Sequence, residues 1–404
     1  MQAQKSLTPG GIATTLGGDI ILGELTVGGG PQKVTIHHFN PLGVHVGSFL
    51  DAVGFSGLQP PLAIFTDPLD HIATARVIFG FGGNSSSNAT LRTLSGGPYR
   101  SVSASWTATS GSKAYFGPPV GDTSGRMVIS AQISPACGIC GPVPDPGVDF
   151  GNGPETGDLL LRYSAAGTYL GSLPNPGTST TDATGDRYEE GKFQGSIDVG
   201  CGVLTGGPGL TTYLSRRDFN GGCIWSKTLP AGASAQVGAD QNLELLFNTT
   251  GSIDLGAGPT PDFGGQNLTI ARLDLGGNLI MSKTVGGPAA SFSALSFDSD
   301  DTGLLLLKAK FTGSVDLGAG PLSNAAGDTF IASFDPTGTL RWSKVVNIGL
   351  PDMYGLGTWF RMVRQPCGMV IATTSATVDL GSGPIVPPQG NALSPNVGIA
   401  ALGL

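Results

Sequence analysis

Two groups of side chains along the chain have the chemistry to hold a ligand. Trp359, Arg361 and Arg364 make one expected strand bulky and cationic where the comparable strands are rich in Ser and Ala. Alternation along a strand puts Trp359 and Arg361 on one side and Arg364 on the other. A guanidinium beside an aromatic ring can hold an anionic or sugar ligand. We therefore predict ligand contacts at Trp359, Arg361, Arg364, Tyr188 and Glu189, the alternative being salt-bridged side chains that fill the centre of the fold.

Clustered carboxylates are the chemistry that a polysaccharide-active enzyme would need. General acid–base cleavage of a glycosidic bond takes two carboxyl groups about 5–10 Å apart. Asp186, Glu189 and Glu190 are the clustered candidates, but adjacent strand residues such as Glu189 and Glu190 point apart. The chain has neither a Gly-x-Ser-x-Gly elbow nor a His-Glu-x-x-His pair. No residue is assigned a catalytic role.

Metal and cofactor sites receive little support from the sequence. Asp298, Asp300 and Asp301 form an acidic turn whose oxygens could ligate calcium, yet no glutamate follows at EF-hand spacing, so a solvated turn is favoured. His37 and His38 are adjacent on an expected strand and face opposite ways, which makes a shared metal difficult. We predict neither a metal nor a cofactor.

The five cysteines leave their pairing open. Cys137 and Cys140 form a Cys-x-x-Cys motif among Pro and Gly, which favours a local disulfide or buried thiols over redox chemistry. A bond between Cys201 and Cys223 would need Cα atoms within about 7 Å. The expected strand order argues against this pair, because a third strand separates the two residues unless a long loop folds back between them. Cys367 is expected to be free.

One short phrase recurs along the chain: a hydrophobic residue, Asp, a hydrophobic residue, then Gly-x-Gly. The Asp side chain can accept hydrogen bonds from the amides of the glycine turn that follows. Residues that recur in this way are expected to be architectural, so we predict turn caps and not catalytic acids. The five clear copies contain Asp149, Asp198, Asp254, Asp316 and Asp379. Two degenerate copies without the Asp precede them, at Leu25–Gly30 and Ile78–Gly83.

Each copy lies within a larger unit of four expected strands. In the sixth unit the strands are 292–297, 304–317, 329–334 and 340–346. Repeated groups of four antiparallel strands without helical periodicity predict the blades of a β-propeller. Trp225 and Trp342, on the last strand of their units, are expected to be packing anchors. We predict an all-β, seven-bladed propeller in a single domain spanning 1–404, with blades at roughly 11–50, 60–110, 112–175, 178–230, 232–286, 290–347 and 355–404 plus 4–9.

The last strands of several units share a motif. Trp225-Ser226-Lys227, Met281-Ser282-Lys283 and Trp342-Ser343-Lys344 occupy equivalent places. The units resemble the SBBP-type seven-bladed β-propeller repeats of exported bacterial proteins, whose repeat ends in a similar Trp-Ser-Lys strand. The resemblance covers nearly the whole chain and implies a fold and an exported location, but no activity.

The two ends of the chain suggest how the ring closes. The seventh unit has three expected strands, and Gln4–Pro9 aligns with the end of a fourth strand, Trp225–Pro230. The N-terminal segment is therefore predicted to supply the outer strand of the last blade, which avoids a long unpaired edge. Removal of residues 1–10 is expected to cost far more stability than loss of a terminal tail.

Composition limits the partners. The net charge of −8 and the pI of 4.9 argue against nucleic acid and anionic membranes, and no apolar stretch approaches the ~20 residues of a membrane span. Low charge and abundant Ser, Thr and Gly suit an exported bacterial protein, extracellular, at the cell surface or periplasmic, whose targeting segment is absent from this chain. We predict a non-enzymatic binding module with a protein or glycan partner. The alternatives are a polysaccharide-active enzyme with carboxylates at the propeller channel, and a calcium-dependent scaffold.

Overall fold

The structure is a computed structural model, and every regular element it describes is a β-strand. Within the described residues, no helix has the length and hydrophobicity needed to cross a membrane. The described residues are 9–15, 19–26, 32–40, 44–54, 63–66, 71–79, 84–92, 96, 98–107, 112–116, 119–135, 147–175, 179–230, 232–238, 240–300, 302–324, 329–346, 359–363, 368–373, 378–379, 384–385 and 398–402.

The first two units are antiparallel sheets whose strands lie side by side in chain order. This order follows from short turns between strands too close in sequence for a crossover. The first sheet consists of β1 (Pro9–Thr14), β2 (Ile20–Thr26), β3 (Gln32–Phe39) and β4 (His45–Gly54). The second consists of β5 (Ala63–Thr66), β6 (Ile72–Phe79), β7 (Asn84–Arg92) and β8 (Pro98–Thr107).

The third and fourth units repeat this order. In the third, β9 (Ser112–Phe116) and β10 (Val120–Gly121) both pair with β11 (Met127–Pro135), followed by β14 (Gly157–Tyr163) and β15 (Tyr169–Pro174). The fourth consists of β16 (Ser179–Thr181), β17 (Arg187–Phe193), β20 (Thr211–Arg217) and β21 (Cys223–Leu229).

The fifth and sixth units confirm the predicted strands most closely. The fifth consists of β22 (Ala233–Val237), β23 (Leu243–Thr250), β24 (Gln266–Leu273) and β25 (Leu279–Gly286). The sixth consists of β26 (Ser291–Ser299), β27 (Leu305–Asp316), β29 (Thr329–Phe334) and β30 (Leu340–Val346). A single residue pair, Gly286 with Asp316, joins the two sheets.

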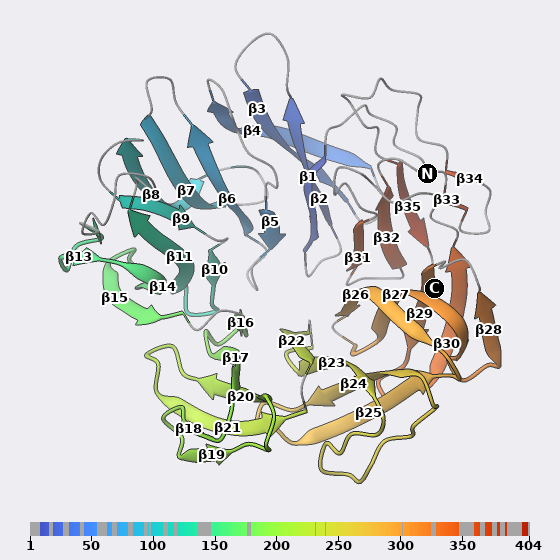
Figure 1. Cartoon of the computed structure of the whole chain (residues 1–404). Helices are drawn as coiled ribbons and strands as arrows, with labels where there is room; N and C mark the ends of the chain where they lie inside the picture. Colours follow the sequence, from blue (N-terminus) through green and yellow to red (C-terminus); the bar gives the residue numbers. More distant parts are fainter. Residues whose placement is uncertain are drawn as a thin grey trace.

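The sheets are arranged around a common centre, with the first strand of each unit innermost (Figure 1). The last sheet, β31 (Trp359–Val363), β32 (Gly368–Thr373) and β35 (Gly398–Leu402), lies next to the first, since β31 contacts β1. This is the architecture of a β-propeller. The predicted closing strand falls outside the described residues except for Pro9, which begins β1.

The core lies between neighbouring sheets, because each sheet is too thin to bury its own apolar face. Tyr188 and Leu214 of the fourth unit pack against Leu243, Leu245 and Phe247 of the fifth. The sixth unit meets the fifth through a second cluster that includes five phenylalanines, Phe292, Phe297, Phe311, Phe330 and Phe334. Alternating strand residues from one sheet therefore meet those of the next.

The Asp-x-Gly-x-Gly phrase forms the tip of a small hairpin that follows the second strand of a unit. Asp149 accepts hydrogen bonds from the amides of Gly151 (2.7 Å) and Gly153 (3.0 Å), and Asp254 accepts them from Gly256 and Gly258. The predicted turn caps are thus confirmed there and at Asp198 and Asp316. The hairpins are β12 (Val148–Asp149) with β13 (Pro154–Glu155), β18 (Ser196–Asp198) with β19 (Val203–Thr205), β28 (Pro321–Asn324) with the end of β27, and β33 (Val378–Asp379) with β34 (Pro384–Ile385).

The sequence argument against a bond between Cys201 and Cys223 was wrong. The two residues form a disulfide, with Cα atoms 5.5 Å apart. The hairpin β18–β19 folds back over the outer side of its sheet, so its tip reaches the start of β21; Arg217 donates to the carbonyl of Val199 at that tip. The predicted unit has four strands and lacks this hairpin, so the prediction places the two cysteines too far apart.

A β-bulge recurs at the start of the outermost strand. The pairing shifts between residues 162 and 163, 216 and 217, 272 and 273, and 333 and 334. One extra residue in the outer strand is left unpaired there, which bends the strand. In three of these sheets the extra residue is a half-exposed aliphatic side chain: Leu170, Ile224 and Ile280.

Candidate functional site

The predicted cationic strand lies at the inner edge of its sheet. Trp359 and Arg361 are on β31, paired with Ala372 and Val370 of β32. This strand contacts β1 and β26, which are also first strands of their sheets. Trp359 and Arg361 therefore occupy backbone positions next to the centre of the propeller (Figure 1). Arg364 lies outside the described residues.

Tyr188 and Glu189 are adjacent on β17, so their side chains lie on opposite faces of the sheet. Tyr188 is 1% exposed, packs edge-on against Trp225 and donates to Asp182 at 3.3 Å. Glu189 is 3% exposed and accepts hydrogen bonds from Arg187 (2.6 Å) and Arg217 (2.7 Å). Neither side chain is brought near β31, so the two predicted groups do not form one site.

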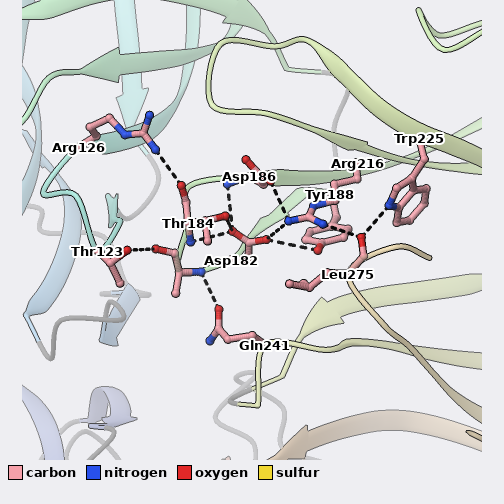
Figure 2. A network of polar contacts seen from close by, with 11 residues as sticks. Thr123, Arg126, Asp182, Thr184, Asp186, Tyr188, Arg216, Trp225, Gln241 and Leu275 are labelled. Carbon is pink, nitrogen blue, oxygen red and sulfur yellow. Dashed lines mark hydrogen bonds and ion pairs between the residues drawn. The ribbon is translucent and has the colours of Figure 1, made fainter. Parts of the chain in front are cut away.

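Asp182 is the centre of a polar network between the fourth and fifth units (Figure 2). Its Oδ1 accepts from the amides of Thr184 (2.9 Å) and Asp186 (3.1 Å), which fixes the turn after β16. Its Oδ2 accepts from Arg216 at 3.2 Å, and Asp186 binds the same guanidinium at 2.8 Å. One guanidinium is thus matched by two carboxylates.

Residues from both neighbouring units reach this turn. Thr123 of the third unit donates to the carbonyl of Ala183, through its amide at 2.9 Å and its hydroxyl at 3.0 Å. From the fifth unit, Gln241 accepts from the Ala183 amide at 2.7 Å. Arg216 and Trp225 both donate to the carbonyl of Leu275, at 2.6 and 2.9 Å. The network therefore holds three consecutive units together (Figure 2).

Trp225 carries out the anchoring role predicted for it. Besides its contact with Tyr188, its ring and Lys227 lie against Gly277 in a turn of the fifth unit. Lys227 donates to the carbonyl of Gly277. Met281 and Lys283 lie in the same way against Gly338 of the sixth unit. The Trp-Ser-Lys strand is thus a contact between units.

A repeated arginine occupies the penultimate position of the third strand in three consecutive units: Arg162, Arg216 and Arg272. Arg272 lies 3.1 Å from Glu244 and 3.7 Å from Asp240, and donates to the carbonyl of Gly303 at 2.7 Å. Burial raises the pKa of Glu244, although Ser299 and Arg272 act against this shift. Arg216 and Arg272 therefore each face two carboxylates.

Arg162 has different surroundings. It donates to the carbonyl of Phe219 at 3.4 Å and to the side chain of Asn220 at 3.3 Å. Its buried Nε has no hydrogen-bond partner, a feature it shares with Arg216 and Arg272. No described carboxylate lies within 4 Å of it. The ring of Phe219 lies 4.1 Å from the Arg126 guanidinium and 5.9 Å from that of Arg162. Arg126 itself pairs with Asp122 at 2.6 Å.

Glu190 is a carboxyl group without an ion-pair partner among the described residues. It lies on β17 between the fourth and fifth units, where its Oε2 is buried and has no hydrogen-bond partner. Burial raises its pKa, opposed by Lys192 and by a hydrogen bond from the backbone of Ala235. Asp186 also has a raised pKa, first because of burial and then because of Asp182, while Arg216 acts against the shift. Burial therefore makes both groups harder to ionise than a carboxyl group in water.

The other candidate residues do not converge. Asp300 accepts hydrogen bonds from the amides of Thr302 and Leu304, so it acts as a turn cap, and Asp301 lies outside the described residues. His37 contacts Ser48 and His38 contacts Asp19, which confirms that they face opposite ways. Within the described parts of the chain, no three His, Cys, Asp or Glu residues form a metal-binding group. Cys137, Cys140 and Cys367 lie outside those parts.

Comparisons with known proteins do not assign the chain to a family. No protein-family profile matches the chain, and no curated protein matches it. Among solved structures, prolyl oligopeptidase B from Galerina marginata is 8% identical, with 98% of this chain and 50% of that one covered and a TM-score of 0.45. The β-propeller domain of the Trilobed protease from Pyrococcus furiosus is 10% identical, with 92% and 90% covered and a TM-score of 0.29.

A polysaccharide lyase, an ulvan lyase bound to a sugar, is also 10% identical, with 99% and 96% covered and a TM-score of 0.37. The chain spans 47% to 62% of the length of the first four solved chains it matches. We take no activity from these structures.

Proposed function

We propose that this protein is a non-enzymatic binding module with a protein or glycan partner. The observation that carries the proposal is how the acidic residues are used. Asp182, Glu189 and Glu244 hold arginines at the boundaries between units, while Asp149 and Asp254 cap turns. These five carboxylates therefore maintain the scaffold.

The scaffold we propose is a seven-bladed ring in which residues 4–9 supply the outer strand of the last blade, as in the SBBP-type repeats that the units resemble. Contact between β1 and β31 supports closure, because it brings the first and last sheets together. We further propose that the protein works outside the cytoplasm of a bacterium. The Cys201–Cys223 disulfide supports this location, since such bonds persist in oxidising compartments.

The proposed ligand site is at the centre of the ring, with contacts from Trp359, Arg361 and Arg364. The position of β31 beside two other first strands supports it. Tyr188 and Glu189 are not included, because both are buried between units. An aromatic ring with a guanidinium suits a sugar or an anionic group.

One observation favours the alternative, a polysaccharide-active enzyme. Glu190 has a raised pKa, as a general acid requires, with burial as the main cause. A glycosidase would also need a second carboxyl group at a fitting distance.

A glycan array and a panel of polysaccharide substrates separate the two functions. Wild type, Arg361→Ala and Glu190→Gln are compared in both assays. We expect binding without turnover, with affinity lowered about tenfold in Arg361→Ala and unchanged in Glu190→Gln. Turnover that disappears in Glu190→Gln would establish the enzyme and overturn the binding module.

A further inference from the structure

The repeated arginine occupies the same position on the third strand of three units, as Arg162, Arg216 and Arg272, so its surroundings can be compared at three boundaries between units. At the two later boundaries it faces two carboxylates, Asp182 and Asp186 for Arg216, and Asp240 and Glu244 for Arg272. At the boundary between the third and fourth units, Arg162 has none among the described residues. A half-buried guanidinium normally has its donors satisfied by acceptors.

The difference has an identifiable origin in the sequence. Asp122 and Asp182 begin equivalent turns, since each accepts from the amides two and four residues later. The residue four positions on is Asp186 in the fourth unit but Arg126 in the third. A carboxylate that binds the repeated arginine in one unit is thus replaced by a cation in the other.

Further arginines add to the positive charge at this boundary. Arg187 and Arg217 share a single carboxylate, Glu189. Burial lowers the pKa of Arg187, Glu189 opposes this shift, and the nearby charges of Arg217 and Arg162 add to it. Among the described residues, Glu189 is thus the carboxylate that pairs with both Arg187 and Arg217, and Arg162 has no ion pair. The Phe219 ring offers Arg162 only a weak cation–π contact.

We propose that the boundary between the third and fourth units binds an oxyanion, a carboxylate, sulfate or phosphate group, on Arg162 beside Arg187. Solvent reaches this place, since Arg162 is half-buried and its partner Asn220 is exposed. The planar guanidinium fork matches such oxyanions in two-pronged hydrogen bonds. This inference rests on the proposed binding function and names a chemical class for part of its ligand.

The test measures binding of inorganic sulfate, inorganic phosphate and acetate to the full chain by calorimetry, alongside thermal unfolding. Sodium chloride at matched ionic strength removes the general effect of salt. We expect a saturable rise in melting temperature with one of the oxyanions beyond that in chloride. Arg162→Gln should weaken that binding about tenfold or more.

Two further variants separate the site from folding. Arg126→Asp restores the carboxylate of the fourth unit and should abolish the oxyanion response in a protein that still melts cooperatively. Arg216→Gln removes the equivalent arginine at the next boundary and should leave the oxyanion affinity unchanged while lowering the melting temperature.

An equal response to oxyanions in wild type, Arg162→Gln and Arg126→Asp would overturn the site. Binding of a neutral glycan together with that result would leave the proposed function standing without the oxyanion site. Turnover of a polysaccharide with an intact oxyanion response would instead overturn the binding module and make this site part of a substrate site.

Discussion

At the scale of single residues, the carboxylates differ by what surrounds them. Glu189 lies between two arginines, whereas Glu190, the next residue, faces the fifth unit without an ion-pair partner among the described residues. A buried carboxylate is favourable when paired with a cation and costly when it is alone. Two adjacent glutamates therefore act on stability in opposite directions.

We expect Glu190→Gln to stabilise the protein above the ordinary glutamate pKa of 4.5. Burial raises the folded-state pKa of Glu190, so the unfolded chain ionises first as pH rises, and folded stability is lost through the folded pKa. The variant should equal wild type at low pH and exceed it by up to about 1 kcal/mol at neutral pH, given the partial exposure of the group. Urea unfolding across pH measures this difference.

Glu189→Gln is the matched comparison on the same strand. It leaves two guanidiniums facing a neutral amide, so it should lower the free energy of unfolding at neutral pH. If both variants shift stability in the same direction at neutral pH, the distinction between a paired and an unpaired carboxylate is mistaken.

Residue roles could be predicted from sequence where they depend on local spacing. The cap at Asp149 is two residues from the first amide it binds, so the repeat alone indicates it. The partner of Arg216 in the next unit, Leu275, is 59 residues away, and such pairs emerge only when whole units are placed side by side. The repeated arginine was nevertheless visible in aligned third strands, and the change from Asp186 to Arg126 in aligned turns.

At the scale of elements, turns of one unit are shaped to receive the outer strand of the unit before. Gly277 has φ of +79°, and a Cβ there would lie 3.1 Å from the Trp225 ring and 3.2 Å from Lys227. Gly258 has φ of +96° with open space around it. A side chain at Gly258 would therefore add backbone strain alone, whereas one at Gly277 would add the same strain and also disturb the contact between units.

We expect Gly258→Ala to cost about 1–2 kcal/mol, the strain of a left-handed residue with a side chain. Gly277→Ala should cost about 1–3 kcal/mol more, because the methyl group displaces Trp225 and Lys227. Urea unfolding of both variants gives the comparison. Equal losses would mean that this contact between units adds nothing.

The disulfide links the β18–β19 hairpin to the outer strand β21, so its removal should increase local opening mainly in that hairpin. For cysteines separated by 22 residues, the loss in the Cys201→Ser, Cys223→Ser double variant should be about 3 kcal/mol in the free energy of unfolding. Amide exchange should increase in 196–205 and stay unchanged in the hairpin 148–155, which has no disulfide. Alkylation of both thiols in the native, unreduced protein would contradict the bond.

Elements were largely predictable because strands and turns leave short-range patterns. The expected strand 340–346 of the sixth unit coincides with β30. The hairpin that brings Cys201 to Cys223 was not predicted, since the direction in which a loop folds depends on the surface beneath it.

At the scale of the whole molecule, stability depends on every sheet having a neighbour. The clusters that bury Phe247 and Phe330 each draw on two adjacent units, so an open ring would expose the faces of its first and last sheets. Contact between β1 and β31 brings those two sheets together.

We expect deletion of residues 1–8 to lower the melting temperature by well over the few degrees typical of a lost tail, because the last sheet would lose its proposed outer strand. Differential scanning calorimetry of the truncated and full chains measures the change. Deletion of the last two residues, 403 and 404, is the control and should change the melting temperature little. A truncated chain that melts like the full chain would rule out closure by the N-terminal segment.

The recurring bulge has a consequence for behaviour at high concentration. In three of the four bulged sheets, the bent outer strand at the rim carries an aliphatic side chain that solvent can reach, as at Ile224 and Ile280. A straight rim with those side chains would offer a second molecule a ready template for edge-to-edge growth into fibres. The kink interrupts that template at the point where Ile224 and Ile280 would otherwise promote it, so crowding alone should not drive these propellers to polymerise.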